Sequence, residues 1–91
     1  MTATTIEQIR AQLIAIFSPN ELTIQDDSHL HKGHPGAADG GGHYTIRITG
    51  TAFNGKSLLE RHRLIYAALA NMMPECIHAL RLDVQGYQEV T

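Results

Sequence analysis

Four of the chain's six histidines lie in one short stretch, Asp26 to Tyr44, which reads DDSHLHKGHPGAADGGGHY. Within it, His31 stands two residues after His29 and three before His34, spacings from which two imidazoles could bind the same metal ion. The stretch is also rich in glycine, so holding it in one conformation costs conformational entropy. A phosphate cradle fits less well, because the stretch connects two predicted strands and leads into no helix N-terminus. The residues by themselves leave a flexible, solvated connection as the default interpretation and a metal-binding loop as the alternative.

A further histidine, His78, lies near the single cysteine, Cys76, in the segment ECIHAL. If the last predicted strand already runs there, His78 shares an apolar face with Leu80 and lies at the rim of the core. The ordinary interpretation is then a packed histidine with one hydrogen bond. Cys76 is interpreted as a small buried hydrophobe, and one cysteine cannot form a disulfide within the chain.

Three basic residues, Lys56, Arg61 and Arg63, lie in the segment FNGKSLLERHR. Near the start of one helix they could contact phosphates or a carboxylate. More commonly such residues form a solvated face with pairs such as Glu60 with Arg63. The sequence shows no paired carboxylates on one helix face and no nucleophile elbow. We therefore expect a protein that is not an enzyme.

Two helices are expected to position these residues. The first follows a capping box from Thr5 to Gln8 and ends before Pro19. The second follows a capping box from Ser57 to Glu60 and runs to Met73, before Pro74. The apolar stripe of the second helix is expected to contain Leu58, His62, Ile65, Leu69 and Met72.

Alternation of apolar and polar residues predicts three strands: residues 21–26, a segment from Tyr44 onward, and residues 77–86. The first two can pair antiparallel across the histidine-rich loop, and the helix between the second and third favours parallel, right-handed pairing. Both helices then cover one face of a mixed three-stranded sheet, in a two-layer α+β domain of order α-β-β-α-β. On the open face, His43 is expected to lie with Thr45 and Arg47.

The net charge is mildly acidic, −2 with neutral histidines, which argues against a protein whose main task is to grip nucleic acid. Protonation of all the histidines would reverse that sign, so the balance depends on pH. The sequence shows no apolar leader and no stretch long enough to span a membrane. We expect a cytoplasmic protein without membrane association, with one domain over residues 1–91 and a flexible loop at about 28–43.

Four segments, DDSHLHKGH, GGGHYTI, FNGKSLLERHRLIYAAL and IHALRL, together resemble the BolA family. They occur in the family's order and spacing and cover nearly the whole chain. The resemblance implies a fold similar to the class II KH domain, in agreement with the predicted order of elements. The Gly-x-x-Gly signature of RNA-binding KH domains is missing before the second helix, where the chain reads FNGKS. We therefore do not expect RNA binding in the usual KH manner.

The resemblance further implies a partner of monothiol glutaredoxins that shares a bridging [2Fe–2S] cluster and serves iron–sulfur trafficking or iron homeostasis. The family's C-terminal ligand histidine falls on His78. Its second ligand, in the loop between the first two strands, falls on His31, with His34 as a substitute. The glutaredoxin and its bound glutathione would supply the thiolate ligands. The isolated chain is then expected to hold no cofactor and to be a monomer or a weak homodimer.

The alternative implied by the resemblance is a DNA-binding transcriptional regulator of stress response and cell morphology. The family's helix-turn-helix-like segment maps to Phe53–Tyr66, with Lys56, Arg61 and Arg63 as the candidate phosphate contacts. The acidic net charge counts against strong binding of this kind.

Overall fold

The computed structural model describes residues 4–28 and 42–88, and its elements follow the predicted order. They are α1 (Thr5–Phe17), β1 (Glu21–Asp26), β2 (Gly42–Thr49), the short 3₁₀ helix η2 (Thr51–Phe53), α3 (Leu58–Ala68), the 3₁₀ helix η3 (Ala70–Met72) and β3 (Ile77–Gln85). The middle strand therefore begins two residues before the predicted Tyr44, and the last strand ends one residue before the predicted position 86.

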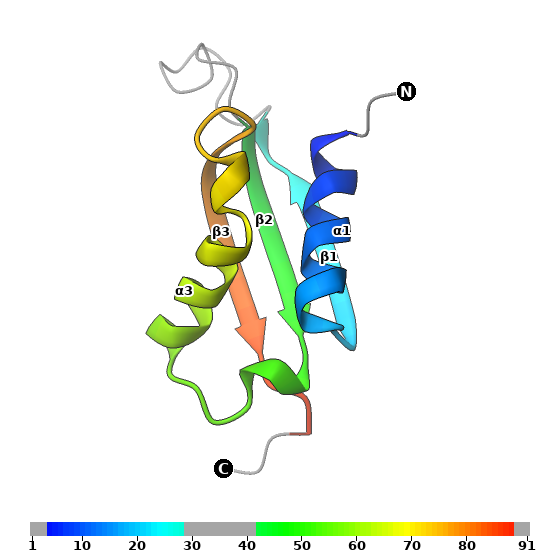
Figure 1. Cartoon of the computed structure of the whole chain (residues 1–91), viewed down its shortest axis with the longest axis vertical. Helices are drawn as coiled ribbons and strands as arrows, with labels where there is room; N and C mark the ends of the chain where they lie inside the picture. The colour runs from blue at the N-terminus through cyan, green and yellow to red at the C-terminus, as the bar shows by residue number, and fades with distance from the viewer. Residues whose placement is uncertain (1–3, 29–41, 89–91) are drawn as a thin grey trace.

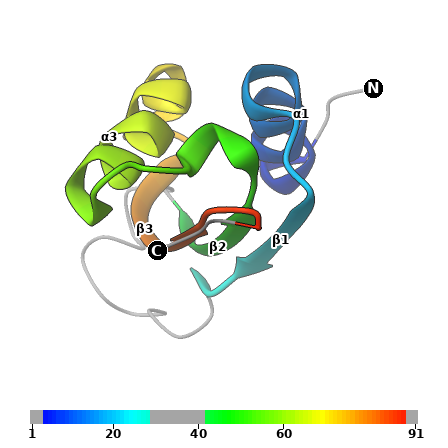
Figure 2. The ribbon, with the colours of Figure 1, turned by 90° about the horizontal axis from the view of Figure 1, so that it is seen from below.

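The sheet has the order β1-β2-β3, with β2 in the centre (Figure 1). The β1–β2 pair is antiparallel, with Ile24 opposite Ile46, and the β2–β3 pair is parallel, with Ile46 opposite Leu82. Figure 2 shows α1 and α3 side by side over the same face of the sheet. The predicted two-layer α+β fold, with strand pairings set by the loop and the helical crossover, is confirmed.

The first helix is capped one residue earlier than predicted. The side chain of Thr4, not Thr5, accepts a hydrogen bond from the backbone N–H of Glu7, at 3.1 Å. Both threonines suit the cap chemically, and the structure places the first of them in the extended conformation that a cap requires. At the other end, Ser18 adopts the left-handed conformation and its N–H donates to the Ile14 carbonyl.

The capping box of α3 is confirmed, because the Ser57 hydroxyl accepts from the Glu60 N–H at 3.1 Å and the Glu60 carboxylate accepts from the Ser57 N–H at 3.0 Å. The helix is shorter than predicted. Its α-helical bonding stops at Ala68, where the next N–H, that of Leu69, is shared between two carbonyls and the chain tightens into η3. The helical path therefore still reaches the neighbourhood of Pro74, but not as one α-helix.

A mainly aliphatic core, with Phe53 and Tyr44 as its buried aromatic residues, fills the space between the helices and the sheet. The predicted stripe of α3 is only partly correct: Ile65, Leu69 and Met72 are buried, whereas Leu58 is 67% exposed. The first turn of α3 does not pack on the sheet, since the adjacent Leu59 is also exposed. The opposite face of the sheet is left uncovered by either helix (Figure 2).

Candidate functional site

A β-bulge at the start of β3 decides where His78 lies. Gly42 pairs with Ile77, but the next residue of β2, His43, pairs with Ala79, so His78 is an extra residue in the ladder. Ile77 and Leu80 consequently both turn toward the core, while His78 is exposed. The prediction that His78 shares the apolar face and lies at the rim of the core was therefore wrong, because strict alternation fails at a bulge.

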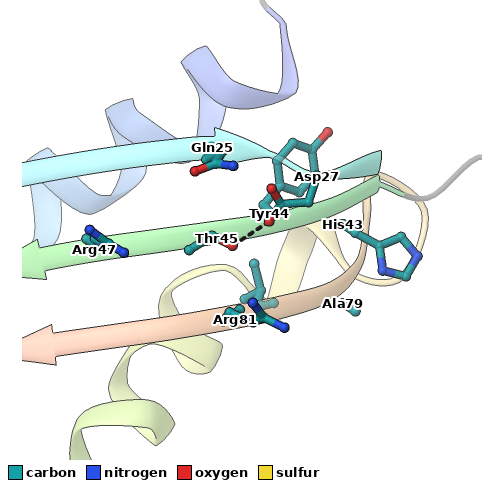
Figure 3. Close-up of a pocket in the computed structure, with 9 residues that line it drawn as sticks. Gln25, Asp27, His43, Tyr44, Thr45, Arg47, Ala79 and Arg81 are labelled. Carbon is teal, nitrogen blue, oxygen red and sulfur yellow. Dashed lines mark hydrogen bonds between the residues drawn. The ribbon is translucent and has the colours of Figure 1, made fainter. Parts of the chain in front are cut away.

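The bulge brings two imidazoles together on neighbouring strands. The ring centroids of His43 and His78 are 5.2 Å apart, with the ring planes at 49°. His43 is half-buried and its Nε2 is shielded from solvent, whereas His78 is exposed. Figure 3 shows His43 at the start of β2, on the same face as Thr45 and Arg47, as predicted from the alternation. Its proximity to His78 was not predicted, since the pairing of the two strands depends on the bulge.

The backbone around His43 also ties the histidine-rich connection to this place. The His43 N–H donates to the Ser28 hydroxyl at 3.1 Å, and its carbonyl accepts from the Asp27 N–H at 2.7 Å. The segment from residue 29 to residue 41 therefore leaves and re-enters the described fold beside His43. His31 and His34, the loop ligands implied by the family resemblance, belong to that segment and lie outside the described residues.

Gly42 and Tyr44, which flank His43 on β2, are both buried. The Gly42 N–H donates to the Cys76 carbonyl at 3.1 Å, and the Tyr44 ring covers Gly42 so closely that an added Cβ would lie 2.5 Å from Oη. Burial raises the pKa of the Tyr44 hydroxyl, and a hydrogen bond with the Thr5 side chain partly opposes that shift. Cys76 itself is exposed, so its interpretation as a buried hydrophobe was wrong.

The three candidate phosphate contacts, Lys56, Arg61 and Arg63, differ in the hydrogen bonds that their side chains make. The Arg61 guanidinium donates to two backbone carbonyls, those of Lys56 at 3.0 Å and Val84 at 3.1 Å, and so fastens the start of α3 to the end of β3. Lys56 and Arg63 instead line a shallow hollow of about 320 Å³ together with Glu60. The pKa of Glu60 is lowered, chiefly by its hydrogen bond with the Ser57 backbone.

Within the described residues, no third possible metal ligand joins the two imidazoles. Among residues 4–28 and 42–88, no three histidine, cysteine, aspartate or glutamate side chains are grouped so that they could hold a metal ion. Within the same residues, neither helix is long and apolar enough to cross a membrane. A metal ion bound by the two imidazoles would therefore need further ligands from outside the described residues.

Comparisons with known proteins agree with this architecture. The sequence model of the family described as BolA-like protein matches residues 13–89. The chain is 41% identical over 88 residues to SufE-like protein 1 of Arabidopsis thaliana, an alignment that covers 91% of this chain but 24% of that protein. It is 32% identical over 83 residues to the DNA-binding transcriptional regulator BolA of Escherichia coli K12, covering 91% and 76% of the two chains.

The solved structure of the BolA domain of SufE1 from Arabidopsis thaliana superposes with a TM-score of 0.83 at 36% identity, covering 99% of this chain and all of that domain. The Escherichia coli relative is named as a regulator and not as an enzyme, which is consistent with the non-catalytic character expected from the sequence. The family match, the relatives and the shared fold lead to one conclusion: the chain belongs to the family of BolA-like proteins.

Proposed function

We propose that this protein is an adaptor that binds a monothiol glutaredoxin and shares a bridging [2Fe–2S] cluster with it, in iron–sulfur trafficking or iron homeostasis. The observation that carries the proposal is the pair of imidazoles, His43 and His78, which the β-bulge sets side by side at one end of the sheet. Because His78 is exposed, a partner could reach it without unfolding the chain.

The spacing of the two rings fits a shared metal centre. Nitrogen ligands lie about 2.0–2.1 Å from a tetrahedral metal ion, which brings the centroids of two bound imidazoles to about 5 Å from each other. The observed separation is 5.2 Å, so His43 and His78 need little backbone movement to approach one ion. Side-chain rotation would have to turn a ring nitrogen of each toward it.

A [2Fe–2S] cluster takes four ligands, so two imidazoles from this chain leave two positions for thiolates of a glutaredoxin and its glutathione. When bound, such a cluster supplies one-electron chemistry, and histidine ligands raise its reduction potential above that of an all-thiolate cluster. His78 is the proposed fixed ligand. The second imidazole comes from His43 on β2, or from His31 or His34 in the connection that begins and ends beside it.

The test is reconstitution of the cluster with a monothiol glutaredoxin and glutathione, followed by visible absorption and circular dichroism. Wild-type protein should give a spectrum distinct from that of the glutaredoxin alone, and His78→Ala should abolish the difference. Separate His43→Ala, His31→Ala and His34→Ala variants then identify the second ligand. Gln85→Ala, an exposed change at the far end of the same strand, is the matched control. A spectrum that is unchanged by His78→Ala would refute the proposal.

DNA binding is the second candidate function, and it is supported by the name of the Escherichia coli relative. Lys56 and Arg63 lie close together near the start of α3, where they could contact phosphates. Arg61 is a weaker candidate, because its guanidinium is already held by hydrogen bonds to two backbone carbonyls. Two phosphate contacts would give a slope of about −2 in log K against log salt concentration. Binding that is equally tight in Lys56→Ala/Arg63→Ala would exclude this surface.

A further inference from the structure

The uncovered face of the sheet carries a hollow of about 380 Å³, which the cluster proposal does not use as a binding site (Figure 3). Small-molecule pockets in proteins start at about 300 Å³, so this volume suits a small ligand. All three strands contribute to its lining, and its polar side chains include Gln25, Asp27, Thr45, Arg47 and Arg81.

The strand register explains why the face is hollow. Gln25, Thr45 and Arg81 form one row across the three strands, and His43 and Ala79 belong to the next row. Successive rows on one face are about 6.7 Å apart. The short side chains of Thr45 and Ala79 form the bottom of the hollow, and the longer side chains around them form its rim.

The charges in the hollow are separated along the strands. Arg47 and Arg81 are exposed on adjacent strands in neighbouring rows, close enough for both guanidinium groups to reach one carboxylate. Asp83 lies opposite Arg47 in the same row, and its carboxylate accepts a hydrogen bond from the Gln85 side chain at 2.6 Å. Within the part of the chain that the structure describes, neither forms an ion pair. Asp27 lies beside His43 in the row beyond Thr45, and the Thr45 hydroxyl donates to one of its carboxylate oxygens. Its second oxygen remains an acceptor for a cation.

We propose that this hollow binds a free zwitterionic peptide of about two residues, with the carboxylate at Arg47 and Arg81 and the ammonium at Asp27. Arg47 and Asp27 are two rows apart, about 13 Å between backbones, and their side chains shorten the gap. An extended dipeptide spans about 7 Å, which fits the space that is left. A dianion would meet the Asp27 carboxylate, and an apolar ligand would leave the guanidinium groups without partners.

The experiment titrates three probes into ¹⁵N-labelled full-length protein and follows the amide signals of β2 and β3. Glycylglycine carries both charged ends, N-acetylglycylglycine lacks the ammonium, and glycylglycinamide lacks the carboxylate. Glycylglycine should give saturable shifts around Thr45, and each capped probe should bind roughly tenfold more weakly, since each loses a charge-assisted hydrogen-bonded contact.

Variants then assign each end of the ligand. Arg81→Gln should weaken the two probes that carry a carboxylate by roughly tenfold and leave glycylglycinamide unchanged. Asp27→Asn, which keeps an oxygen to accept from Thr45, should weaken only the two probes that carry an ammonium. Arg63→Gln on α3, with the same loss of charge away from the open face, should weaken none. Absence of saturation up to tens of millimolar glycylglycine, or equal losses in Arg81→Gln and Arg63→Gln, would overturn the proposal.

Discussion

Replacing Gly42 by alanine should destabilise the fold through one identified contact. The new Cβ would lie 2.5 Å from both Cε2 and Oη of Tyr44 and 2.6 Å from Cζ. Carbon atoms in good contact are about 3.5–4.0 Å apart, so the ring would have to move by about 1 Å. Tyr44 is buried, and its hydroxyl is bonded to Thr5, so the ring has little room to do so.

The magnitude follows from two opposing effects. Crowding a packed site costs about 1–3 kcal/mol, whereas replacing glycine by alanine stabilises by about 0.4–1 kcal/mol through the unfolded chain, where the backbone permits it. Gly42→Ala should therefore lower the free energy of unfolding by about 1–2 kcal/mol. With a urea dependence of about 1 kcal/mol/M for a small domain, the unfolding midpoint should fall by about 1–2 M.

A double-mutant cycle in urea separates the contact from the backbone effect. The clashing atoms belong to the far end of the tyrosine ring, which leucine lacks. In a Tyr44→Leu background, Gly42→Ala should thus become neutral or slightly stabilising. Gly50→Ala, whose added Cβ would lie 3.4 Å from the Pro19 Cα, is the control and should change little. If Gly42→Ala were equally destabilising in both backgrounds, the crowding against Tyr44 would not be its cause.

Three further predictions concern stability. The pKa of Tyr44 is raised in the folded state, so the neutral hydroxyl contributes fully to stability below pH ~10, and this contribution is lost as the pH rises through the folded-state pKa. Urea titrations of wild type and Tyr44→Phe measure it. The difference between their unfolding free energies should shrink only above pH ~10. Gln12 of α1 donates to the Ala68 carbonyl at the end of α3, at 2.8 Å. Gln12→Ala should therefore lower the unfolding free energy by about 1 kcal/mol and speed amide hydrogen exchange in η3. Unchanged exchange would show that this bond does not hold the two helices together. Arg61→Ala should cost about 1–2 kcal/mol in urea unfolding by freeing the Lys56 and Val84 carbonyls. Arg61→Lys should recover less than half of the lost unfolding free energy, because one ammonium nitrogen replaces the two nitrogens that donate to Lys56 and Val84. Full recovery would contradict a link that needs two donor nitrogens.

The fold was accessible from the sequence because its signals are local and agree with one another. The box at Ser57 and Glu60 fixes where α3 begins, and the alternation from Tyr44 to Ile48 fixes which face of β2 is buried. A helix between two strands then leaves little choice of topology. The end of α3 was harder to predict, since the change to 3₁₀ bonding at Leu69 depends on packing and not on a helix-breaking residue.

The site was less accessible, because it depends on contacts between distant segments. The family resemblance pointed to His78, but alternation alone placed that residue toward the core. No sequence pattern predicts the bulge opposite His43. The bulge decides both the exposure of His78 and the proximity of the two rings. The open-face hollow was missed for a similar reason: Thr45, Arg81 and Asp27 come together only through the strand register.

The bulge also explains how one end of a small sheet can serve both the core and the proposed cluster site. A regular ladder would force a choice, because with Ile77 turned inward the alternation would point Ala79 inward as well and leave Leu80 in solvent. One extra residue at His78 lets Ile77 and Leu80 both pack while two consecutive side chains remain outside. Gly42 makes this possible, because its N–H bonds to Cys76 just before the bulge and its missing side chain admits the Tyr44 ring. A perturbation at Gly42 should therefore disturb the imidazole pair as well as the core, and the cluster spectrum of Gly42→Ala should weaken even where the protein remains folded.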